Sequence, residues 1–118
     1  MRAVVQRVAS ASVEVEGRIV SEIGPGLLVL VGLHDSDTEA DADYICRKVL
    51  NMRLFPNEQN GKTWDQSVVQ RNYGVLLDGI FGARMKVQLV NDGPVTMQLD
   101  SSHLERNASE VAEDGEQA

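Results

Sequence analysis

Apolar positions in the first third of the chain either alternate with polar ones or run together, and neither pattern has a helical period. Residues 11–15 alternate between Ala or Val and Ser or Glu, which is typical of a strand with one buried and one wet face. Residues 2–8 and 18–23 also favour strands, and Gly24-Pro25-Gly26 breaks the chain. Residues 27–33 are nearly all apolar. We therefore expect residues 27–32 to form the most buried strand.

One stretch has the period of a helix. Its apolar positions lie three or four residues apart: Ala42, Ile45, Val49 and Met52. Thr38 suits an N-cap, and Asp41, three residues further on, resembles the acid of a capping box. The pattern predicts an amphipathic helix over about residues 38–53.

The second half of the chain favours strands again. Residues 74–77 resemble the start of a buried strand, and residues 85–90 and 95–99 alternate on either side of Asn91-Asp92-Gly93-Pro94. The predicted order is four strands, a helix, a strand and two strands. That order indicates an α+β fold, rich in β structure, with one main helix.

Composition and charge narrow the class of protein. The chain has 118 residues, with 42% hydrophobic and 25% charged residues and a net charge of −7. It has neither a signal-peptide pattern nor an apolar run of the ~20 residues that a membrane helix needs. We expect a single cytoplasmic domain over residues 1–101. Residues 102–118 carry one Arg and five acidic residues, which predicts an acidic, disordered tail.

Side chains that could carry chemistry are sparse. A single cysteine, Cys46, excludes an internal disulfide, and its helical setting favours a small packing residue over a nucleophile. His34 and His103 lie far apart, so no metal site is predicted. No Ser-His-Asp arrangement and no phosphate-binding loop is recognisable.

The segment 91–96 allows two interpretations. Asp, Gly and Pro favour a tight turn between two strands. Alternatively, Gly93 and Pro94 could direct their carbonyl groups outward and line a pocket with rigid acceptors. An acidic chain is poorly suited to broad contact with a phosphate backbone, so any nucleic acid would be held at a small part, such as a single-stranded end.

Five blocks of sequence carry a specific resemblance that covers nearly all of residues 1–101. They are MRAVVQRV (1–8), IGPGLLVLVG (23–32), KVLNMRLF (48–55), NGKTWDQSV (60–68) and FGARMKVQLVNDGPVTMQLDS (81–101). In this order they resemble the D-aminoacyl-tRNA deacylase family. The resemblance implies a homodimeric, barrel-like α+β protein that hydrolyses the ester of D-aminoacyl-tRNA, and also of the achiral glycyl-tRNA. Its partner is the aminoacylated 3′ end of tRNA, and neither a metal nor another cofactor is implied.

The resemblance also implies roles for particular residues. Gly93 and Pro94 match a cis Gly-Pro pair that one subunit presents to the active site of the other, where its carbonyls exclude L-amino acids. Arg7 matches a residue that orients this pair; the alternative is a surface charge at a strand end. Four residues match a stretch near the terminal adenosine of tRNA, although they could equally be core residues at the start of a strand: Phe81, Gly82, Ala83 and Met85.

The chain departs from the family after Leu77. In the family this strand continues into a Ser-Gln-Phe-Thr stretch, then a loop and a helix; here Leu77 is followed directly by Asp78. The missing segment lines the pocket opposite the Gly-Pro pair, so we expect an incomplete fold and site. Two alternatives to an active enzyme stay open: an inactive isoform that dimerises or binds a partner, and an interaction module that acts through the acidic tail.

Overall fold

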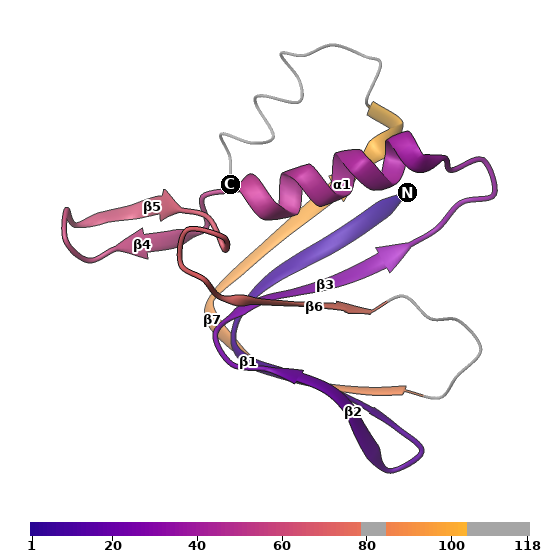
Figure 1. Cartoon of the computed structure of the whole chain (residues 1–118), viewed down its shortest axis with the longest axis horizontal. Coiled ribbons are helices and arrows are strands. Elements are labelled where there is room, and N and C mark those ends of the chain that lie inside the picture. The colour runs from indigo at the N-terminus through magenta and orange to yellow at the C-terminus, as the bar shows by residue number, and fades with distance from the viewer. Residues whose placement is uncertain (79–84, 104–118) are drawn as a thin grey trace.

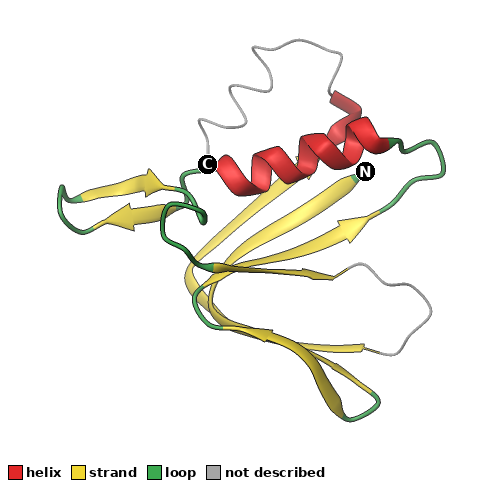
Figure 2. Ribbon diagram, in the orientation of Figure 1, coloured by secondary structure: helices red, strands yellow, loops and turns green. Residues whose placement is uncertain are grey.

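A curled sheet with one covering helix forms the framework of the chain (Figures 1 and 2). The structure is a computed structural model, and it describes residues 1–78 and 85–103. The elements are β1 (Arg2–Val15), β2 (Arg18–Ile23), β3 (Gly26–Gly32), α1 (Glu39–Asn51), β4 (Phe55–Asn57), β5 (Lys62–Gln66), β6 (Gly74–Asp78), β7 (Met85–Asp100) and the 3-10 turn η1 (Ser101–His103).

The two longest strands, β1 and β7, determine the shape of the sheet. They pair antiparallel from Arg2↔Asp100 to Val15↔Met85, and both bend near their middle, so that the sheet curls into a half-barrel (Figure 1). The other edge of β1 pairs with β3 in its first half and with β2 in its second half. Strand β6 pairs parallel with β3, and β4 and β5 form a separate hairpin. The α+β, barrel-like prediction is confirmed.

The curl divides the core in two. The first cluster lies between α1 and the sheet, and it includes Val5, Leu27, Val29, Ile45 and Leu54. The second lies on the concave side of the half-barrel and consists of Val8, Ala11, Val13, Leu28 and Leu76. Strand β3 contributes to both because its successive side chains point to opposite faces.

Helix α1 begins and ends close to its predicted limits. The Thr38 hydroxyl accepts a hydrogen bond from the Ala40 N–H, and the Asp41 carboxylate accepts one from the Thr38 N–H at 2.8 Å. This capping box confirms the predicted start of the helix. No helix within residues 1–78 and 85–103 is long and apolar enough to cross a membrane.

Strand β3 has the largest share of buried residues among the strands, as expected, but Leu30 and Cys46 are more exposed than predicted. Leu27, Leu28 and Val29 are fully buried, but Leu30 is 38% exposed. Leu30 shares the concave face with Leu28 but lies one residue pair further along the sheet, beyond the reach of the second cluster. Cys46 is exposed on α1 rather than packed.

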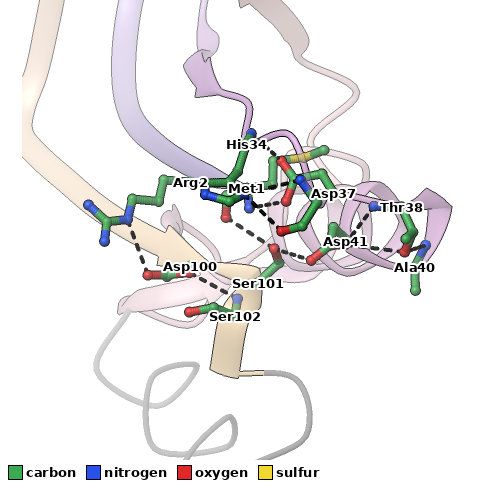
Figure 3. A network of polar contacts seen from close by, with 11 residues as sticks. Met1, Arg2, His34, Asp37, Thr38, Ala40, Asp41, Asp100, Ser101 and Ser102 are labelled. Carbon is green, nitrogen blue, oxygen red and sulfur yellow. Dashed lines mark hydrogen bonds and ion pairs between the residues drawn. The ribbon is translucent and has the colours of Figure 1, made fainter.

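A polar network joins the start of β1 to the end of β7 and to α1 (Figure 3). The amino group of Met1 donates to the Asp37 carboxylate at 2.6 Å. The Ser101 hydroxyl donates to Asp41 at 2.6 Å, and the Ser101 N–H donates to the Met1 carbonyl at 2.9 Å. The hydrogen bond from the Met1 amino group lowers the pKa of Asp37, and the one from the Ser101 hydroxyl lowers the pKa of Asp41.

Truncation at two neighbouring positions of β3 tests the burial pattern. We expect Leu28→Ala to lower the free energy of unfolding by about 2–5 kcal/mol, because it leaves a cavity in a closed core. The matched substitution Leu30→Ala removes the same atoms from a partly exposed position and should cost less than half as much. Urea unfolding of both variants measures the difference, and equal losses would contradict the exposed position of Leu30.

The polar network predicts a loss of stability in acid. Because the folded pKa of Asp41 lies below its ordinary value of 3.8, its contribution is complete above that value and disappears as the pH falls through the folded pKa. Ser101→Ala should therefore flatten the decline in stability as the pH falls below 3.8. Ser102→Ala is the control, since Ser102 is exposed and bonds Asp100 through its backbone N–H. Thermal unfolding across this pH range gives the comparison.

Candidate functional site

Strand β7 leaves β1 for four residues in the middle of its length. Gln6 pairs with Thr96 and Val8 pairs with Asn91, so residues 92–95 of β7 face only Arg7 on β1. The predicted tight turn between two strands is wrong, since one strand runs through this segment with a bulge. A bulge of this kind bends the strand and presents the extra residues away from the ladder.

Gly93 and Pro94 lie at this bulge, which we call the Gly-Pro bulge (residues 92–95). Both residues are exposed, and the peptide bond between them is cis, as the family resemblance implies. Gly93 has a φ of +132°, a backbone angle that residues other than glycine rarely adopt. An added Cβ would also lie 3.0 Å from both Arg7 Nη2 and Val95 Cγ2. Glycine is therefore required here by conformation and by space.

Arg7 fastens the Gly-Pro bulge to the core. Its side chain is 11% exposed; Nε donates to the Asp92 carbonyl at 2.9 Å, and Nη1 donates to the Leu54 carbonyl at 2.5 Å. The Asp92 carboxylate lies 3.4 Å from Nε and offsets part of the buried charge. The surface-charge alternative for Arg7 is wrong. The carbonyl that Arg7 holds is the one just before Gly93, so it fixes the entry to the Gly-Pro pair.

Trp64 completes the surroundings of Arg7. It belongs to β5, and its ring centroid lies 5.6 Å from the guanidinium carbon of Arg7, within the range of a cation–π contact. The Trp64 side chain is nevertheless 50% exposed. Sequence reasoning gave this residue no role. The available signal was a single tryptophan in a short polar hairpin, inside one of the blocks that carry the family resemblance.

The remaining predicted site residues do not join this cluster. Phe81, Gly82 and Ala83 lie outside the described residues. Met85 begins β7 opposite Val15 and packs, half-buried, against the concave core. Gly93 lies eight residues after Met85 along β7, a path of up to about 26 Å at ~3.3 Å per residue. Figure 1 shows the start of β7 at the far end of the lower half of the sheet from the bend of that strand.

A hollow of about 580 Å³ lies elsewhere in the molecule, beside the polar network at the N-terminus. Its acidic groups Asp37 and Asp41 already accept hydrogen bonds from Met1 and Ser101. Residues 1–78 and 85–103 contain no group of three or more His, Cys, Asp or Glu side chains that could hold a metal ion. The Gly-Pro bulge is therefore the better candidate site, and it offers backbone carbonyls rather than acid–base side chains.

The class of protein is defined by its fold and its candidate site together. The fold is a half-barrel with one helix, and one bent strand of it carries a glycine–proline bulge that a buried arginine holds in place. The family model described as D-Tyr-tRNA(Tyr) deacylase matches residues 4–77 and 76–100. The D-aminoacyl-tRNA deacylase of Dictyostelium discoideum is 40% identical over 148 residues, covering 86% of this chain and 98% of that protein. The chain belongs to the D-Tyr-tRNA(Tyr) deacylase family.

Two further comparisons support this assignment to the family. The D-aminoacyl-tRNA deacylase of Drosophila melanogaster is 36% identical over 158 residues, covering 94% of this chain and 99% of that protein. A solved structure named c-Myc DNA Unwinding Element Binding Protein superposes with a TM-score of 0.78 at 33% identity, covering 85% of this chain and 98% of that one.

The comparisons also locate what is missing. The alignment of 148 residues with the Dictyostelium protein is longer than this whole chain of 118 residues, although it covers only part of it. The family match falls into two stretches that meet at residues 76–77, within β6. The relatives therefore carry a segment, which we call the relatives' segment, after the part that matches β6, and this chain lacks it.

The fork of hydrogen bonds from Arg7 gives a prediction for stability. Arg7→Lys keeps the charge, but one ammonium cannot reproduce the planar fork that reaches both the Asp92 and Leu54 carbonyls. We expect a loss of about 1–3 kcal/mol in the free energy of unfolding, the usual cost of an unsatisfied buried polar group.

The matched control is Arg2→Lys, whose side chain is 75% exposed and pairs with Asp100 at 3.3 Å. Exposed ion pairs contribute little, so this variant should unfold in urea like the original chain. Equal effects at the two positions would contradict the anchoring role of Arg7.

Proposed function

We propose that the chain acts on D-aminoacyl-tRNA and hydrolyses the ester between the D-amino acid and the terminal ribose, releasing the amino acid and free tRNA. The observation that carries this proposal is the Gly-Pro bulge held by Arg7, in a chain whose relatives are D-aminoacyl-tRNA deacylases. Glycyl-tRNA, which has no side chain to exclude, fits the same site.

Selectivity in this proposal comes from the backbone. A carbonyl wall at Gly93 and Pro94 leaves no room for a side chain in the L configuration, which is discrimination by a built-in clash. Such a wall has to be rigid, and the buried guanidinium of Arg7 provides a fixed donor behind it. Asp92 and Arg7 pair with each other, and the proposal assigns no proton transfer to either of them. Water attack is assisted instead by backbone groups and by the 2′-hydroxyl of the ribose.

The site requires two copies of the chain. Within one chain, Met85, which we assign to the region of the terminal adenosine with Phe81, Gly82 and Ala83, lies far along β7 from Gly93. A bulge that projects from one subunit can reach the adenosine region of another. Val90 is 57% exposed and Leu89 is 36% exposed, and both precede the bulge on β7. These side chains would be covered in such a homodimer.

Contact with tRNA in this proposal is confined to the aminoacylated 3′ end. A net charge of −7 does not favour extended contact with phosphates. The cytoplasm is the compartment that this substrate implies.

The missing segment favours one rival function, an inactive chain that still dimerises. One wall of the pocket, the Gly-Pro bulge, is present, while the residues that follow β6 in the relatives are absent. The other rival, an interaction module formed by the acidic tail, concerns residues 102–118, of which 104–118 lie outside the described residues.

The activity of this chain should be strongly reduced. We expect D-tyrosyl-tRNA hydrolysis at least about 100-fold slower than in a chain with the relatives' segment restored after Leu77, because misplacement by ~1 Å or loss of one oxyanion donor can each cost that much. Release of D-tyrosine from labelled tRNA measures the rate, with protein from a host that lacks its own deacylase.

Two controls complete this experiment. The restored chain should leave L-tyrosyl-tRNA intact, and Pro94→Ala in the restored chain should weaken that discrimination. If the 118-residue chain matches the restored chain in rate, the relatives' segment does not carry the second wall.

A further inference from the structure

One face of the sheet is only partly covered. Helix α1 packs over β1 and β3, and its diameter of ~10 Å spans about two strands at their ~4.8 Å spacing. The sheet continues beyond β3 to β6. Figure 1 shows β6 running below α1, on the far side of β3. The face that packs against α1 is therefore wider than a single helix can cover.

The exposure of the side chains shows where the cover provided by α1 ends. Val5, Val29 and Leu77 lie in one row across β1, β3 and β6, because each is in register with the next. Val5 and Val29 are fully buried, whereas Leu77 is 63% exposed. The row thus passes from closed core to solvent within one strand spacing.

A groove of about 380 Å³ lies at this boundary, between α1 and β6. Its lining is almost wholly apolar and includes Val31 of β3, Leu33 directly after β3, Leu50 of α1, and Val75 and Leu77 of β6. Leu33 is 59% exposed and Leu50 is 36% exposed. An apolar surface of this kind beside an existing helix has the form that receives a second amphipathic helix.

The comparisons identify what fits this groove. The two stretches that match the family meet in β6 at residues 76–77, and Leu77 itself lines the groove. The residues that the relatives carry at this point, and that this chain lacks, therefore begin at the rim of the groove. A segment that starts there covers Leu77 and Val75 at once.

We propose that this groove is an open docking site for one amphipathic helix within the relatives' segment, and that the chain binds this segment in trans as a separate polypeptide. The anchor of the Gly-Pro bulge does not involve the groove, so the two parts of the fold are independent. Docking closes the first core without any change in β7.

Cys46 supplies a direct readout. It is exposed, it borders the groove, and it is the only cysteine of the chain. The probe is a synthetic, capped peptide with the sequence of the segment that the Dictyostelium relative carries between its two matching parts. Saturating peptide should slow modification of the Cys46 thiol by a disulfide reagent several-fold, and the dependence on peptide concentration gives the Kd.

Two substitutions with nearly equal exposure form the control. Leu77→Asp places a charge in the groove and should weaken binding by at least about tenfold. Val69→Asp makes the same change at a side chain that is 61% exposed and outside the groove, and it should leave the Kd unchanged. Because Leu77 and Val69 are largely in solvent, neither substitution removes core packing.

Three results would overturn the proposal. Cys46 could stay equally reactive at millimolar peptide, or Leu77→Asp and Val69→Asp could have the same effect. Without peptide, protection that rises with chain concentration would show that a second copy occupies the groove. Reactivity that increases when residues 104–118 are removed would show that the chain's own tail occupies it.

Discussion

The candidate site depends on the hydrogen bonds of one group, the Arg7 guanidinium. One planar group joins three segments: β1, which carries it, the Gly-Pro bulge of β7, and the connection between α1 and β4 through Leu54. A buried cation is costly unless its donors are satisfied, and here two backbone carbonyls, the Asp92 carboxylate and the Trp64 ring surround it. The same contacts that make the burial of Arg7 tolerable also fix the conformation of the bulge.

Local patterns predicted most of the framework because local interactions determine it. The Thr38 capping box and the apolar spacing located α1, and the alternation in residues 11–15 and 85–90 located strands that are half covered. Period and capping depend on neighbours within a few residues. Expectations about burial failed where they depended on distant segments. Leu30 and Leu28 have the same chemistry and the same face, and only the curl of the sheet distinguishes them.

In the candidate site, too, the features that depend on distant segments could not be predicted from local patterns. Gly93 and Pro94 were predicted as site residues from a resemblance, while motif reasoning alone favoured a turn between two strands. The bulge could not be foreseen because it depends on the register of β7 against β1, where one residue faces four. Trp64 was missed for a similar reason: its contact with Arg7 joins two hairpins that are distant in sequence. A site built from backbone carbonyls also leaves few side-chain signatures to recognise.

The consequences of the missing segment follow from where the anchor lies. Every residue that holds the Gly-Pro bulge belongs to a part of the chain that matches the family: Arg7, Leu54, Trp64 and Asp92. The hydrogen bonds, the ion pair and the cation–π contact of Arg7 reach Asp92, Leu54 and Trp64, and none of these residues belongs to β6, where the relatives' segment begins. The absence of the relatives' segment instead affects the edge of the sheet. There, Leu77 is exposed to solvent, and β6 is the last strand in the order. An exposed apolar edge strand is a site for association with other chains. The Gly-Pro bulge and the relatives' segment are thus physically separable, because a buried arginine, and not a residue of β6, holds the bulge in place.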